Sequence, residues 1–483
     1  MPVRIVLIAL IVATAASLSA QPAPTTLDTY TRARRLVDAA VAAHGGVDAL
    51  RAARQMRVRR EGYDLWRHQS RGAAAPYDRE PFTSDLHIDL ANGRLVAEER
   101  RTYPGGTHRH FSFVTGRDLS AYLNHMRRTF MVDDYPPAET QTGNLYTLPQ
   151  LALLAAHESD LRLRALGPIT LASGARVEAI TTTAGGNTLT IGLDPETHLL
   201  RAIVGARVDA VEGVTATETE FLSYRMLDGV LMPERRVTRI GGEITQDTTF
   251  TKVVRDYRAP DDLVRPPASY DKVTVPATPM VRELAPGVWL VGGEAASLVV
   301  AMDDHVIVVD AAPSVAAQVA KQAATLAPGK PIRYVAPTHH HDDHASGLRT
   351  LASAGTTIVT TAGNSAMFER FSKAPIEVVK GSRTWTAGTR TVEIRDIGPS
   401  PHANEMLVAW LPAEGILFQA DLIDVGADGL IRPGMNNDTT MHFATWLAAQ
   451  PWKVRTFAGA HGGAIDAATF QQLVAQPVSA LPR

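Results

Sequence analysis

Segments in which apolar and polar residues alternate dominate the first half of the sequence. They include Leu86–Leu90, Thr188–Leu193, Val237–Ile240 and Thr248–Val253, and turn signals such as Asn-Gly, Asp-Pro and Gly-Gly follow the first three. A period of two places successive side chains on opposite faces of a strand. The pattern therefore predicts a mainly antiparallel β domain over residues 27–258, a curved, half-barrel-like sheet with one apolar face.

Helical spacing interrupts this pattern twice. Tyr30–Ala43 has apolar residues on one side and ends before Gly45-Gly46, and Thr26, Asp28 or Thr29 can cap its start. A second helix is expected near Leu148–Ala156.

His108 and His110 share one face of a predicted strand beside Arg101 and Arg109. Because two ligands rarely make a metal site, we interpret this as a polar face turned to solvent.

Strands and helices alternate in the second half. Strands are expected at Ala296–Met302, His305–Val309 and Pro331–Ala336, with a helix at Val315–Leu326 before the third of these. This alternation predicts a layered α/β domain over residues 280–476. Six prolines between positions 259 and 286 predict a stiff, extended linker, residues 259–279, that belongs to neither core.

The first 20 residues have the layout of a secretory signal peptide. Arg4 precedes an apolar run of 14 residues, Ile5–Leu18, and small residues follow at Ser19 and Ala20. A membrane span needs roughly 20 apolar residues, so cleavage is favoured over anchoring. We therefore expect an exported protein, periplasmic or extracellular.

Composition excludes several kinds of chemistry. The chain of 483 residues has a formal net charge of -2 and no cysteine. Without a large basic region a nucleic-acid partner is not expected. Without cysteine there are no disulfides, thiolate ligands or cysteine nucleophiles. The sequence does not indicate an oligomeric state.

The strongest chemical signal is the stretch Thr338–His344, which reads T-H-x-H-x-D-H. It places His339, His341, Asp343 and His344 in a loop between a predicted strand and a predicted helix. Imidazole and carboxylate ligands suit zinc or another borderline divalent metal. Three further residues, His402, Asp421 and His461, each follow the end of a predicted strand, where sites in α/β domains are built. His340 is expected either beside the ligands or facing solvent, and His305 at the surface.

These motifs resemble those of the metallo-β-lactamase superfamily over residues 280–476, and Asp310 also fits its pattern. The resemblance implies an αββα sandwich with His339, His341 and His402 on one metal, Asp343, His344 and His461 on a second, and Asp421 bridging. Asp343 would also act in catalysis by orienting a metal-bound hydroxide. Two divalent cations are expected, zinc first, with iron or manganese as alternatives.

Departures from the family pattern narrow the range of reactions that we expect. Cysteine-ligated β-lactamases need a cysteine where Asp421 stands, so β-lactamase activity is less favoured. Flavodiiron oxidoreductases carry Glu where His341 stands, which disfavours redox chemistry. The usual Thr-Pro-Gly after His402 is replaced by Ala403–Met406. We expect hydrolysis of an ester, thioester, lactone or related bond in a small-molecule substrate, with phosphodiester hydrolysis as an alternative.

The first half resembles the outer-membrane lipoprotein carrier and its sorting-protein relatives. The similarity rests on Ala43–Leu50, on Leu193–Leu200 and on Tyr224–Pro233. It implies a half-open β-barrel that shelters a lipid or acyl group. The alternative function is therefore a lipid- or lipoprotein-binding carrier whose metal domain is structural.

Overall fold

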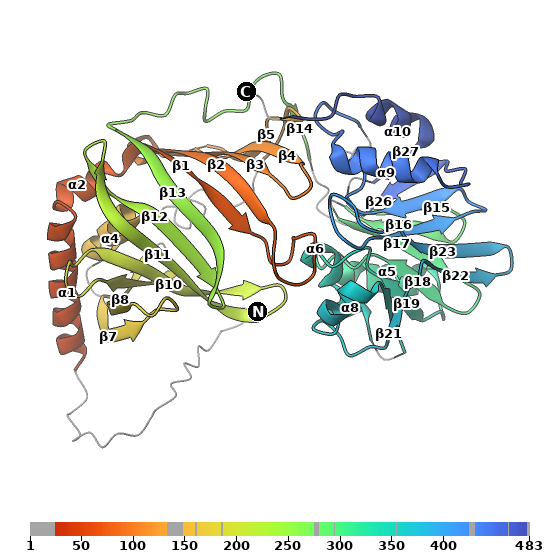
Figure 1. Ribbon diagram of the computed structural model, residues 1–483, viewed down its shortest axis with the longest axis horizontal. Helices are drawn as coiled ribbons and strands as arrows, with labels where there is room; N and C mark the ends of the chain where they lie inside the picture. Colours follow the sequence, from red (N-terminus) through yellow and green to blue (C-terminus); the bar gives the residue numbers. More distant parts are fainter. Residues whose placement is uncertain are drawn as a thin grey trace, which may run out of the picture.

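The computed structural model describes residues 25–116, 118–132, 148–159, 162–184, 187–274, 280–293, 295–353, 355–424, 430–461 and 463–480. The chain forms two parts, a β-rich first domain drawn from red to green in Figure 1 and a second domain drawn from green to blue. The predicted signal peptide, residues 1–20, lies outside the described residues. None of the helices in the described ranges is long and apolar enough to cross a membrane.

One sheet of fourteen strands makes up the first domain, and all its pairings are antiparallel except that of β14 with β6. The order is β14-β6-β5-β4-β3-β2-β1-β13-β12-β11-β10-β9-β8-β7, so two meanders meet where β1 pairs with β13. The strands are β1 (Gln55–Leu65), β2 (Arg79–Asp89), β3 (Arg94–Thr102), β4 (His108–Thr115), β5 (Ser120–Asn124), β6 (Thr129–Val132), β7 (Arg164–Thr170), β8 (Arg176–Ala184), β9 (Asn187–Leu193), β10 (Leu200–Asp209), β11 (Gly213–Leu227), β12 (Val230–Ile240), β13 (Glu243–Arg255) and β14 (Asp271–Lys272). The predicted large antiparallel sheet is confirmed.

Helices α1 (Thr26–Ala43), α2 (Val47–Ala52) and α4 (Pro149–Glu158) pack against the β7–β11 part of this sheet, and the 3-10 turn η1 (Leu90–Asn92) joins β2 to β3. Both predicted helices are present. The predicted cap of α1 was wrong by one residue, because Thr25 accepts the backbone N–H of Asp28 while Asp28 accepts that of Thr25. This reciprocal capping box satisfies two backbone donors at once.

The proline-rich linker packs on the first domain, contrary to the expectation that it belongs to neither core. Leu263 and Val264 lie against an apolar cluster of β3, β4 and β5, and β14 extends the sheet beside β6. The Tyr270 hydroxyl lies 2.8 Å from Nδ1 of His125, whose Nε2 is 2.7 Å from Oγ of Ser112. Prolines prevent regular structure but leave the intervening apolar side chains free to pack.

The contact between His125 and the linker predicts a pH-dependent stability. Burial, and then the nearby His110, lower the pKa of His125 from 6.5 to about 4. The unfolded chain therefore binds the proton more readily than the folded chain, and stabilisation that is complete above pH 6.5 is lost as the pH falls towards 4. The contribution is on the order of 2–3 kcal/mol. Urea unfolding between pH 7 and pH 4 should show a smaller decline for His125→Gln than for the wild type; equal declines would contradict the prediction.

Two sheets form the second domain. The first has the order β15-β16-β17-β18-β19-β20-β21 and the second runs in sequence from β22 to β27. The strands are β15 (Met280–Ala285), β16 (Val288–Gly292), β17 (Ala296–Ala301), β18 (Val306–Val309), β19 (Ile332–Ala336), β20 (Thr357–Thr360), β21 (Ile376–Val378), β22 (Ser382–Ala387), β23 (Arg390–Asp396), β24 (Leu407–Leu411), β25 (Ile416–Gln419), β26 (Thr456–Gly459) and β27 (Ala464–Asp466).

Side chains on both faces of these sheets are buried. Leu298 and Val300 of β17 join the core between the two sheets, while Val299 joins the cluster beneath the helices α5, α7 and α8. Helices α9 and α10 pack on the second sheet in the same way. Burial on both faces explains the continuous apolar runs in the sequence. The helices are α5 (Ala316–Leu326), α6 (Asp342–Ala345), α7 (Leu348–Leu351), α8 (Ala362–Phe368), α9 (Asp438–Ala448) and α10 (Ala467–Val474).

Candidate metal centre

The histidine-rich stretch leaves β19 and enters the short helix α6. His339, His341 and His344 are each at most 2% exposed, so three imidazoles are withdrawn from solvent within six residues. β18 runs parallel to β19 and ends immediately before Asp310. The loop and Asp310 therefore meet at one edge of the sheet.

The second sheet brings its residues to the same edge. Asp421 follows β25 and His461 follows β26, and these two strands are parallel, so their C-terminal ends lie together. His402 lies in the loop between β23 and β24. A bridge between Ala295 and His461 joins the two sheets at this position.

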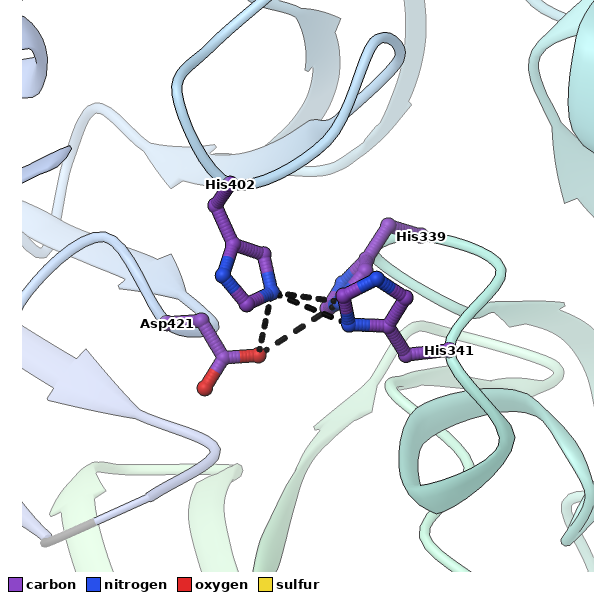
Figure 2. A group of neighbouring side chains, drawn as sticks. All are labelled: His339, His341, His402 and Asp421. Atoms are coloured by element: carbon purple, nitrogen blue, oxygen red, sulfur yellow. Dashed lines mark hydrogen bonds and ion pairs between the residues drawn. The ribbon is translucent and has the colours of Figure 1, made fainter. Parts of the chain in front are cut away.

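One group of candidate ligands consists of His339, His341, His402 and Asp421, whose ligand atoms all lie within 4.8 Å of one another. Figure 2 shows the side chains converging from three separate loops. Nε2 of His402 is 3.1 Å from Nε2 of His339 and 3.0 Å from Nδ1 of His341. Oδ2 of Asp421 is 3.3 Å from His402 and 3.4 Å from His339.

A second group consists of Asp343, His344 and His461. Nε2 of His461 is 3.1 Å from Nε2 of His344, and Oδ2 of Asp343 is 3.5 Å from both nitrogens. Asp421 reaches this group too, with Oδ2 2.8 Å from His344 and Oδ1 3.6 Å from His461. The seven predicted residues thus form two adjacent groups, and Asp421 contacts both.

The outward ring nitrogens have polar partners that orient the rings. Nδ1 of His344 is 2.6 Å from Oδ2 of the fully buried Asp310. The other oxygen of Asp310 accepts hydrogen bonds from the backbone N–H and hydroxyl of Thr338, whose hydroxyl is also 3.1 Å from Nδ1 of His339. Such partners fix the tautomer and direct the inner nitrogen towards the centre, as at metal sites.

The first domain supplies two further partners that the sequence did not reveal. Nε2 of Gln69 donates to Oδ1 of Asp342 and to Oδ1 of Asp343, both at 2.7 Å. The carbonyl oxygen of Ser70 lies 2.9 Å from Nε2 of His341, so this ring presents Nδ1 to the centre. These residues belong to the connection between β1 and β2, which faces α6 (Figure 1). They lie in no motif, and their role depends on how the two domains pack.

The hairpin turn between β3 and β4 contacts the second domain where His402 is held. Gly105 has φ 83°, and a Cβ at this position would lie 2.0 Å from the carbonyl oxygen of Pro401. Glycine is therefore required both by the left-handed backbone and by the close approach. The first domain supports the loops of the site as well as covering it.

Asp310 and Asp421 share an uncommon backbone conformation, with φ of 73° and 58°. Residues other than glycine rarely adopt positive φ, although Asp and Asn tolerate it best. Such strain persists where surrounding contacts determine the conformation, and it often marks functional sites. Here it aims both carboxylates into the histidine cluster.

The electrostatics of the first ligand group fit a site for a divalent cation, whereas in the second group the neighbouring carboxylates outweigh burial and raise the pKa values of His344 and His461. Burial, and then the neighbouring imidazoles, hold the pKa values of His339 and His341 well below 6.5, so both present lone pairs. Burial opposes ionisation of Asp421, but His344, His402 and His461 outweigh it and keep its pKa well below 3.8. Neutral imidazoles and ionised carboxylates are the forms that bind metals. Inner nitrogens about 3 Å apart cannot all hydrogen-bond one another, and a cation would satisfy them.

The structure also places two other histidines for which an expectation came from the sequence. His340 is only 1% exposed, which excludes the solvent-facing alternative, and burial is the largest cause lowering its pKa to about 4. His305 is 9% exposed and packs its ring against Tyr334, so the prediction of a surface position was wrong. Both side chains fill space beneath loops that the sequence pattern could not place.

A cavity of about 1090 Å³ opens onto the centre and is lined by both domains. The second domain contributes the side chains of His341, Asp343, His402, Asp421 and His461. The first domain contributes Trp66, Gln69, Tyr103, Arg109, Phe113 and Tyr122. The volume suits a small-molecule substrate.

Comparisons with known proteins agree with this geometry. Residues 290–458 match the model of the metallo-beta-lactamase superfamily. The second domain is that of a metal-dependent hydrolase. No curated protein matches the sequence. The first domain lies outside the matched segment, so its resemblance to lipoprotein carriers stays a prediction.

Solved structures of other proteins are similar to part of this chain, as three of them illustrate. The flavodiiron protein from Giardia intestinalis is 19% identical over 41% of this chain and 59% of its own length, with a TM-score of 0.34. A metallo-beta-lactamase from Pontibacter korlensis is 19% identical over 41% and 97% of the two chains, with a TM-score of 0.33. The metallo-beta-lactamase FIM-1 from Pseudomonas aeruginosa, in a mono-zinc form, is 23% identical over 41% and 94%, with a TM-score of 0.32. No functional conclusion follows from these likenesses.

Proposed function

We propose that the protein is an exported hydrolase that binds two divalent cations, zinc first, and cleaves an ester, thioester, lactone or related bond in a small molecule. The observation that carries the proposal is the convergence of seven ligand-type residues in two groups joined by Asp421. We further propose that the two packed sheets with helices on their outer faces are the αββα sandwich of the superfamily. Export rests on the layout of residues 1–20.

His339, His341 and His402 would hold one cation, Asp343, His344 and His461 the other, and Asp421 would serve both. When bound, such cations lower the pKa of water and polarise the bond to be cleaved. The chain's own contribution is orientation. Asp343 is suited to orient an attacking water through Oδ2, because Gln69 holds its Oδ1.

The charged residues that line the cavity help to choose between the hydrolase and the lipid carrier. Arg67, Arg109, Arg127 and Arg207 line it together with several carboxylates, which is a poor environment for an acyl chain. We therefore prefer the hydrolase to the carrier with a structural metal domain. Asp421 in place of a cysteine disfavours a β-lactamase of the cysteine-ligated kind, and phosphodiester hydrolysis remains the second candidate reaction.

Metal analysis combined with activity tests the proposal. Purified mature protein should contain about two equivalents of transition metal and hydrolyse 4-nitrophenyl acetate or bis(4-nitrophenyl) phosphate. Chelation should reduce the rate by about 100-fold or more, because water activation is lost. Adding back zinc, manganese or iron separately identifies the active metal. An active protein without bound transition metal would overturn the proposal, and activity with iron alone would favour redox members of the superfamily.

A further inference from the structure

Arg109 lies on β4, on the wall of the cavity that the first domain provides, with Phe113 and Tyr122 beside it on the same wall. Its side chain is exposed to the cavity. The guanidinium carbon lies 4.1 Å from the ring centroid of Tyr103. Stacking of this kind holds the planar guanidinium in one orientation and leaves its N–H groups free at the edge.

The guanidinium of Arg109 has no carboxylate partner among the described residues. Two other arginines of the cavity wall differ, because Arg127 forms an ion pair with Asp424 and Arg67 pairs with Asp209 and Glu243. A charge confined by protein on several sides is costly unless an opposite charge compensates it. Among the described residues, Arg109 is thus an oriented cationic group that faces the cavity without a carboxylate at ion-pair distance.

The surroundings of Arg109 also favour an anion. Burial, and then the positive charge of Arg109, lower the pKa of Arg127 to about 10, so the two guanidinium groups lie close enough to repel each other. Arg109 and Asp421 of the candidate metal centre line the same cavity, and against the effect of burial the carboxylates of Glu80 and then Asp421 act electrostatically to raise the pKa of Arg109. Two divalent cations would carry more positive charge than Asp343 and Asp421 together can balance. An anionic group in the cavity would relieve this excess.

We propose that Arg109 binds an oxyanion of the substrate, a carboxylate or a phosphate, so that the metal centre acts on anionic small molecules presented by the first domain. The guanidinium offers a two-pronged hydrogen-bonding edge that matches the paired oxygens of either group. Phe113 and Tyr122 offer apolar surface to the part of the substrate between the anion and the bond to be cleaved. This inference rests on the proposed hydrolase function and adds a substrate class to it.

The test compares two esters that differ only in charge, mono(4-nitrophenyl) glutarate and its methyl ester. The metal-loaded wild type should prefer the free acid by about 10- to 100-fold in kcat/KM, mainly through a lower KM, as expected for a charge-assisted hydrogen bond. Arg109→Gln should abolish the preference. Arg109→Lys should keep part of it, because the charge remains without the planar edge. Arg225→Gln removes an exposed arginine on β11 that does not line the cavity, and it should behave as the wild type.

Calorimetry with the metal-free protein separates this inference from the proposed hydrolysis. Glutarate or inorganic phosphate should bind the wild type and the Arg225→Gln control but not Arg109→Gln, and the tighter of the two ligands identifies the oxyanion. Equal kcat/KM for the two esters in the wild type, or an unchanged preference in Arg109→Gln, would overturn the inference while leaving hydrolysis intact. Anion binding without hydrolysis of any ester would instead count against the proposed function alone. If Arg109→Gln does not fold, Arg109→Lys provides the test, because it should lose part of the preference for the free acid.

Discussion

Replacing Asp421 with asparagine should reduce kcat/KM by about 1000-fold or more and leave fewer than two metal equivalents bound. Asp421 is the residue whose carboxylate contacts both groups of ligands, with Oδ2 within 3.4 Å of His339 and 2.8 Å of His344. Asparagine tolerates the positive φ of 58° at this position, so the backbone should be retained. The substitution therefore removes the negative charge with the least change of shape.

Elemental analysis and ester hydrolysis measure the two effects separately. Asp303→Asn is a matched control, because Asp303 is an exposed aspartate in the turn between β17 and β18. It should keep both metals and full activity. If Asp421→Asn retained two metal equivalents and near wild-type rates, the bridging role would be wrong and the two ligand groups would act independently.

Asp310→Asn should have the second largest effect, because Asp310 holds two parts of the centre. Its Oδ1 accepts two hydrogen bonds from Thr338, and its Oδ2 lies 2.6 Å from Nδ1 of His344. An asparagine can still accept from Thr338, but it presents an N–H group or a neutral oxygen to His344. We expect about 3 kcal/mol less free energy of unfolding in the metal-free protein, since a buried charge-assisted contact is lost. Metal affinity should fall by about 10- to 100-fold.

Urea unfolding and competition titration with a metal-binding dye measure these two quantities. Asp304→Asn provides the matched control, because Asp304 also contacts a histidine, His305, but its side chain is 70% exposed. An exposed pair of this kind contributes little to stability. Similar effects of the two substitutions would show that burial of Asp310 does not matter and would contradict the prediction.

Local pattern predicted the elements of both domains well, and its failures have a common cause. The meander and the helices of the first domain follow from periodicity and turn residues, and so do the apolar strands around β17. The prediction that the linker belongs to neither core was wrong. Proline content restricts backbone geometry but does not determine whether Leu263 and Val264 pack against the first domain. His305 was misjudged in the same way, since a turn can be covered by a neighbouring strand.

Residue type and spacing predicted the residues of the metal centre that belong to the second domain, but not the residues that the first domain contributes. His339 to His344 are close in sequence, and His402, Asp421 and His461 each follow a strand. These residues could therefore be assigned to one site from the sequence. Gln69 and Ser70 carry no such signal, although they hold Asp343 and His341. Arg109 was noticed only as part of a polar strand. Its orientation towards the cavity depends on the face of β4 that meets the second domain.

By itself, the sequence determined the two-part organisation, the strand-rich first half and the type of chemistry, because periodicity and ligand spacing are local properties of the chain. Tertiary structure alone decided that the first domain contributes to the site and that Arg109 faces the same cavity. These features arise from contacts between residues hundreds of positions apart, such as Gln69 with Asp343. Their geometry is set by how two folded surfaces pack, which no local pattern encodes.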